Sequence, residues 1–127
     1  MIDHVSVHVT DVARAREFYR AALAPAGYEL LKQYPDLDNP FAVGFGVAGK
    51  PDLWLVKGTP TGSQHVAIRS ATRSVVAAFH AAALAAGGTD HGAPGVRAHY
   101  HPAYYGAFVL DPDGHNLEVV CHEPYIE

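Results

Sequence analysis

The sequence repeats itself at an offset of 61 residues, and this repeat limits the folds that the chain can adopt. The His-Val pair at 4–5 aligns with the His-Val pair at 65–66, and Phe18 aligns with Phe79. Two copies are too few for a solenoid, which needs at least about three stacked units. Two copies instead suit a pseudo-symmetric domain in which each module covers the apolar face of the other.

Each half of the chain has the same predicted order of elements. An alternating strand comes first, an Ala-rich helix that ends at glycine follows, and three short strands complete the half. The helices are expected over 12–23 and 72–86. We therefore predict one α+β domain built from two βαβββ modules. The parts are module one over 1–58, a linker over 59–64 and module two over 65–122.

Composition narrows the range of functions. The 127 residues carry a net charge of −4 with no basic cluster, which argues against nucleic acid as a partner. No apolar run approaches the roughly 18–20 residues of a membrane span, and no signal peptide is visible. The single cysteine, Cys121, excludes an intrachain disulfide and fits a reducing compartment, so we expect a cytoplasmic protein. Histidine is as frequent as lysine and arginine together, which indicates metal or proton chemistry.

Three side chains stand out as candidate metal ligands. His4 and His65 begin the two repeat-related strands, and Glu118 lies within the apolar last strand. If these strands line a common trough, two imidazoles and one carboxylate face a single point, which is the facial triad of non-haem iron and similar ions. Such a triad leaves positions open for substrate, so it is catalytic in type. The alternative is that each histidine merely ends a strand and Glu118 pairs with an arginine.

Further candidates lie on the same strand faces and in the segment 97–106, in which six of ten residues are His, Tyr or Arg. An extended segment of this kind could supply an acid or base and an aromatic wall, or it could pack on the barrel or on a partner. The candidate acid–base residues are His8, His101 and Tyr105. The candidate pocket residues are Ser6, Trp54, Arg69, His99 and Tyr100.

The run at 111–114, Asp-Pro-Asp-Gly, predicts a turn, because proline sets φ at its second position and glycine permits positive φ at its last. We expect His115 next to this turn to lie at the surface. Cys121 lies on the strand face opposite Glu118, so it is expected to be a packed apolar residue and not a nucleophile.

Together, the two His-Val strand starts, the Phe-Tyr pair at 18–19 and the run from Asp111 to Glu118 resemble the vicinal oxygen chelate superfamily. The resemblance implies an eight-stranded, incompletely closed barrel around one divalent ion such as Fe²⁺, Mn²⁺, Zn²⁺ or Ni²⁺. It implies that His4, His65 and Glu118 are the ligands. Small members of this superfamily commonly dimerise, and open sheet edges also favour pairing, so we expect a homodimer.

One position departs from the pattern of glyoxalase I. That enzyme has a fourth ligand, usually a carboxylate, where this sequence has Trp54. Glyoxalase I activity is therefore disfavoured, and so is fosfomycin chemistry, because a cluster of Lys and Ser is missing. The expected function is that of a metal-dependent enzyme of dioxygenase, lyase or isomerase type on a small substrate with vicinal oxygens. The alternatives are a bleomycin-resistance-like binding protein without turnover and a chain that has the fold but no physiological metal.

Overall fold

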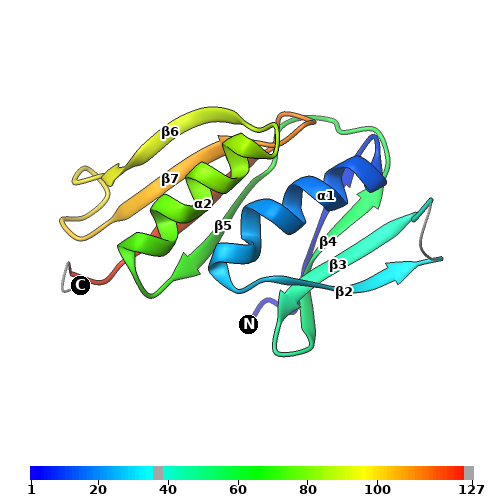
Figure 1. Cartoon of the computed structure of the whole chain (residues 1–127), viewed down its shortest axis with the longest axis horizontal. Helices are drawn as coiled ribbons and strands as arrows, with labels where there is room; N and C mark the ends of the chain where they lie inside the picture. The colour runs from blue at the N-terminus through cyan, green and yellow to red at the C-terminus, as the bar shows by residue number, and fades with distance from the viewer. Residues whose placement is uncertain (36–38, 125–127) are drawn as a thin grey trace.

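The computed structural model describes residues 1–35 and 39–124, and its order of elements confirms two βαβββ modules (Figure 1). Module one contains β1 (Val5–Val9), α1 (Val12–Leu23), a short 3₁₀ helix η1 (Ala24–Ala26), β2 (Glu29–Tyr34), β3 (Ala42–Val47) and β4 (Lys50–Lys57). Module two contains β5 (His65–Ser70), α2 (Arg73–Ala85), β6 (Thr89–Val96), β7 (Tyr105–Leu110) and β8 (Asn116–Cys121).

The strands form two separate four-stranded sheets, with the orders β1-β4-β3-β2 and β5-β8-β7-β6. The first strand of each module runs parallel to the last, and the other pairs are antiparallel. The α+β fold is therefore confirmed, whereas the expected single eight-stranded barrel is not confirmed, because the strands form two separate sheets. The reason is the contact between α1 and α2, which holds the modules side by side, with both helices on the same side of the two sheets (Figure 1).

Each helix begins at a side-chain cap and buries one apolar stripe. The Asp11 carboxylate accepts a hydrogen bond from the Arg14 N–H at 3.0 Å, and Thr72 caps α2 in the same way. The stripe of α1 is fully buried and contains Val12, Ala15, Phe18, Tyr19, Ala22 and Leu23. The two helices therefore cover one face of each sheet, and this layer is the hydrophobic core.

The other face of each sheet points away from the helices, and we call it the open face. Alternation along β1 shows the division, because Val7 and Val9 are buried whereas Ser6 and His8 are exposed. The open faces carry most of the candidate site residues. Among the described residues, no helix is long and apolar enough to cross a membrane.

The turn at 111–114 in module two forms hydrogen bonds with residues of module one and so joins the two modules. The Tyr19 hydroxyl of α1 donates to Asp111 Oδ2 at 2.6 Å, and the Thr10 hydroxyl donates to Asp113 Oδ1 at 2.7 Å. Burial and the neighbouring Asp111 carboxylate raise the pKa of Tyr19 well above its ordinary value. The two aspartates of the turn therefore fix the relative positions of the modules.

His115 completes this junction, which corrects the expectation that it lies at the surface. Its side chain is buried, with 2% of the residue exposed. Its Nδ1 accepts a hydrogen bond from the Gln64 N–H at 2.9 Å, so its proton resides on Nε2, which donates to the His8 carbonyl at 2.8 Å. His115 is thus a neutral crosslink between the linker, β1 and the turn.

Candidate functional site

His65 and Glu118 form the polar centre of the open face in module two. The parallel pairing of β5 with β8 places Glu118 opposite Ala67, and the His65 Nε2 lies 2.8 Å from Glu118 Oε1. The Glu118 residue is 0% exposed, whereas the His65 side chain is 54% exposed. A buried carboxylate requires a polar partner, and here that partner is an imidazole on the neighbouring strand, not an arginine.

Tyr104 is a second partner of Glu118. Its hydroxyl donates a hydrogen bond to Glu118 Oε2, so each carboxylate oxygen has its own partner. Gly106 makes the space for this contact, since a Cβ there would lie 3.1 Å from Oε2 and 3.2 Å from the Tyr104 ring. Burial and the nearby carboxylate raise the pKa of Tyr104, which keeps the hydroxyl protonated as a donor.

Tyr105, an expected acid–base residue, does not lie on the open face with Glu118. Tyr105 begins β7 and faces the core side, where the Arg73 guanidinium of α2 lies 4.8 Å from its ring centre. Tyr104 precedes the strand and reaches the open face instead. Sequence reasoning identified the right segment but missed Tyr104, because alternation cannot assign faces outside a strand.

An aromatic cluster extends outward from Tyr104. We define it as His99, Tyr100, His101, Tyr104 and His122. Tyr100 packs 4.8 Å from the Tyr104 ring, and His99 packs 4.2 Å from the Tyr100 ring. His101 and His122 both meet the Tyr104 ring edge-on. The structure thus brings His99, Tyr100 and His101 together next to Tyr104, and it adds His122, which the sequence did not single out.

The two histidines of the cluster are hydrogen-bonded to each other. His101 Nδ1 accepts from the Ala103 N–H at 3.1 Å, so its Nε2 carries the proton and donates to His122 Nδ1 at 2.8 Å. The Nδ1 lone pair of each of these two histidines therefore already accepts a hydrogen bond. His101 is held as a donor in this arrangement and is not poised as a general base.

The open face of module one carries the other candidates. Trp54 stacks on Tyr34 with ring centres 5.9 Å apart at 18° and lies flat over Gly44. Ser6 and His8 line a cavity of about 140 Å³, which is also bordered by Pro60, Thr61, Gly62, Gln64 and His115. In module two, Arg69 makes an exposed ion pair with Glu123 at 3.2 Å and does not contact Glu118.

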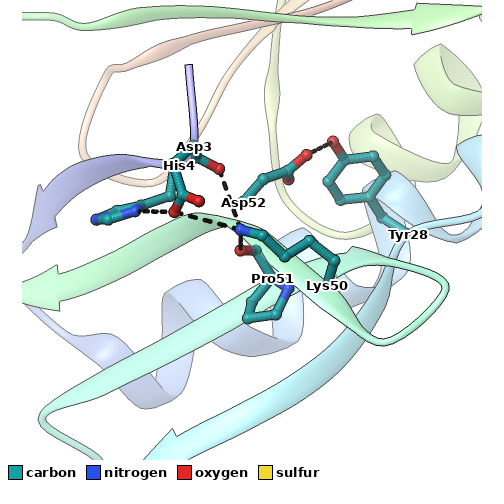
Figure 2. Close-up of polar contacts among 6 residues, drawn as sticks. All are labelled: Asp3, His4, Tyr28, Lys50, Pro51 and Asp52. Carbon is teal, nitrogen blue, oxygen red and sulfur yellow. Dashed lines mark hydrogen bonds and ion pairs between the residues drawn. The ribbon is translucent and has the colours of Figure 1, made fainter. Parts of the chain in front are cut away.

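His4 does not join His65 and Glu118 within one chain. Its Nδ1 lies 2.7 Å from Asp3 Oδ1 at the start of module one (Figure 2). Across residues 1–35 and 39–124, no group of three His, Cys, Asp or Glu side chains is arranged to hold an ion. The expected convergence of all three ligands is therefore not observed in the single chain, because the sheets that carry them do not face each other.

The donors that do meet fit a divalent ion in chemistry and spacing. Imidazole and carboxylate ligands bind at about 2.0–2.2 Å, so two of them in adjacent positions stand about 3 Å apart. The separation of 2.8 Å between His65 Nε2 and Glu118 Oε1 is that of a hydrogen bond, and it keeps the two donor atoms close to this spacing. Module two thus provides two adjacent donors, and its aromatic cluster walls one side of them.

Two pseudo-symmetric βαβββ modules with a His–Glu pair on an open face define the vicinal oxygen chelate class of proteins. The chain belongs to the family of glyoxalase-like domains, whose model matches residues 4–120. None of the curated proteins compared with the chain matches it.

Solved structures share this fold. A glyoxalase/bleomycin resistance protein from Albidiferax ferrireducens T118 is 24% identical, with a TM-score of 0.73 over 95% of this chain and 98% of that chain. A glyoxalase/bleomycin resistance protein/dioxygenase family enzyme from Burkholderia phytofirmans PsJN is 19% identical, with a TM-score of 0.71 over 96% and 98%. An E144Q mutant of glyoxalase I from Zea mays is 25% identical, with a TM-score of 0.68 over 94% of this chain and 46% of that chain.

Proposed function

We propose that the chain is a metal-dependent enzyme of the vicinal oxygen chelate type, acting on a small substrate with two neighbouring oxygens. The observation that carries this proposal is the buried Glu118 carboxylate, with His65 on one oxygen and Tyr104 on the other. A divalent ion bound there would polarise substrate oxygens as a Lewis acid. The reaction belongs to the dioxygenase, lyase or isomerase classes.

His65 Nε2 and Glu118 Oε1 would hold the ion from module two. We propose that His4 completes the set from a second copy of the chain. In a two-fold dimer, the open face of module one in each copy covers the open face of module two in the other, which makes two equivalent sites. Exposed apolar side chains flank both faces and support such contacts: Tyr34, Phe41, Val96 and Tyr100.

The residues around the pair have distinct roles in this proposal. Tyr104 holds Glu118 Oε2 by its hydroxyl proton and leaves Oε1 directed toward His65. The aromatic cluster excludes water from that side of the substrate, and the His101–His122 pair fixes the loop that carries Tyr104. The single buried cysteine, Cys121, supports a reducing, cytoplasmic location for this enzyme.

A second candidate function is binding without turnover. The observation that favours it is the stack of Trp54 on Tyr34, a flat aromatic surface on the open face of module one. Such a surface binds planar ligands by stacking. A protein that only sequesters its ligand would use this surface and would need no ion.

The experiment that separates the two functions is metal analysis of protein purified without added metal, followed by calorimetry with Mn²⁺ and Zn²⁺. The enzyme proposal expects about one ion per chain. Metal-loaded protein is then assayed against catechols and α-keto acids. A wild-type protein that binds no divalent ion at neutral pH would contradict the proposal and leave the binding function.

A further inference from the structure

The imidazole of His4 is oriented by the residue that precedes it. His4 Nδ1 lies 2.7 Å from Asp3 Oδ1 (Figure 2). An ionised carboxylate can only accept hydrogen bonds, so Nδ1 carries a proton, and in the neutral imidazole this is the one ring proton. The lone pair of Nε2 is therefore left free, in the tautomer that a metal-binding imidazole needs.

Lys50 fixes the carboxylate that orients His4. Its ammonium donates to Asp3 Oδ1 at 3.3 Å, to the Asp3 carbonyl at 3.3 Å and to the Pro51 carbonyl at 3.0 Å, so three acceptors use its three protons (Figure 2). Lys50 begins β4, and it thereby ties the segment before β1 to the neighbouring strand. The hydrogen bond from His4, followed by Lys50, holds the pKa of Asp3 below its usual value.

Module two lacks this arrangement. The repeat places Gln64 where module one has Asp3, and the Gln64 N–H is used by His115. The other carboxylate in the same corner, Asp52, accepts from the Tyr28 hydroxyl at 3.1 Å and is turned away from His4 (Figure 2). Of the two repeat-related histidines, only His4 is therefore paired with a carboxylate from the residue that precedes it, whereas His65 meets Glu118 of another strand.

We propose that Asp3, held by Lys50, is a positioning residue that keeps His4 in the Nδ1–H tautomer and presents Nε2 to the ion. This inference rests on the proposed function, in which His4 is the third ligand. A carboxylate behind a metal-bound histidine fixes its tautomer and orientation and raises its basicity. Loss of such a partner typically lowers metal affinity about 10–100-fold.

The first test needs no metal. Two-bond ¹H–¹⁵N correlation spectra at pH 8 report which ring nitrogen of His4 carries the proton. We expect Nδ1–H in the wild type and a shift toward Nε2–H in Asp3→Ala, while Asp52→Ala, the matched loss of a nearby carboxylate, leaves the tautomer unchanged. An Nε2–H form in the wild type, or no change in Asp3→Ala, would overturn the inference and leave the proposed function standing.

The second test measures Zn²⁺ affinity of the same proteins by calorimetry. Asp3→Ala is expected to weaken binding about 10–100-fold, and Lys50→Met to weaken it by a smaller factor, with Asp52→Ala near the wild type. Equal losses of Zn²⁺ affinity in Asp3→Ala and Asp52→Ala would mean that either carboxylate only attracts the cation by its charge. That result would overturn the inference. A wild type that binds no Zn²⁺ would overturn the proposed function. It would also overturn the role proposed for the Asp3–His4 pair, whichever ring nitrogen of His4 carries the proton.

Discussion

Trp54 occupies in module one the strand position that Glu118 occupies in module two. Trp54 pairs with Ser6 across β1 and β4, and Glu118 pairs with Ala67 across β5 and β8. Ser6 and Ala67 are equivalent in the 61-residue repeat. The two open faces therefore have equivalent strand positions, but module one has an aromatic ring where module two has a carboxylate.

This substitution predicts little or no glyoxalase I activity. Without a carboxylate at position 54, proton transfer in the methylglyoxal–glutathione adduct loses a contribution of roughly 10²–10⁴ in rate. The measurement is a paired assay of metal-loaded protein against this adduct and against catechols and α-keto acids. Robust turnover of the adduct would show that another residue serves as the base, and His8 would be the first to mutate.

Glu118→Gln is expected to weaken divalent-ion binding by tenfold or more, or about 1.4 kcal/mol. The amide keeps the size of the side chain but removes the charge and places an NH₂ group against one of its two partners. Calorimetry with Mn²⁺ checks the loss. The matched control is Glu123→Gln, which removes an exposed carboxylate that pairs only with Arg69 among its described contacts, and it should bind Mn²⁺ like the wild type.

A site shared between two copies predicts complementation. His4→Ala and Glu118→Gln each damage both sites of their own homodimer. In a mixed dimer of the two variants, one site carries both changes and the other carries neither, so one intact site returns. Differently tagged chains allow the mixed dimer to be purified and titrated with Mn²⁺. If each site were formed within one chain, the mixed dimer would bind no better than its parents. A monomer mass by light scattering would also contradict the shared site.

The hydrogen bond between Tyr28 and Asp52 predicts a loss of stability in alkali. Burial, and then the Asp52 carboxylate, raise the pKa of Tyr28 to about 12 in the folded protein, whereas an unfolded tyrosine ionises near pH 10. Between these values the unfolded state binds fewer protons, so the free energy of unfolding falls as pH rises. Urea unfolding from pH 9 to 12 should show a steeper fall in the wild type than in Tyr28→Phe. Parallel curves would contradict the assignment.

Much of the fold follows from local sequence patterns. The α1 bounds of 12–23 match the prediction, because a cap at Asp11 and the Pro25–Gly27 stop mark both ends. The faces of β5 and β8 follow from alternation, which put His65 and Glu118 on one side. Local patterns do not show whether the two sheets close into one barrel. The packing of α1 against α2 decides how the modules are placed relative to each other.

The parts of the site that the sequence did not reveal depend on contacts between distant residues. Tyr104 lies in a loop, where neither alternation nor helical period assigns a direction to its side chain. His115 resembles an exposed turn residue, but its two ring nitrogens meet groups from the linker and from β1. Only the folded arrangement of both modules brings those groups together.

His115→Ala therefore tests the junction between the modules. The change removes the acceptor of the Gln64 N–H and the donor to the His8 carbonyl, at a residue with 2% exposure. A buried polar group that loses its partner costs about 1–3 kcal/mol. Two groups lose theirs here, so the free energy of unfolding should fall by about 2–6 kcal/mol. The control, His91→Ala, alters an exposed histidine and should stay within about 0.5 kcal/mol of the wild type. Denaturant unfolding of both variants checks the difference, and equal stabilities would mean that the turn at 111–114 holds the modules without His115.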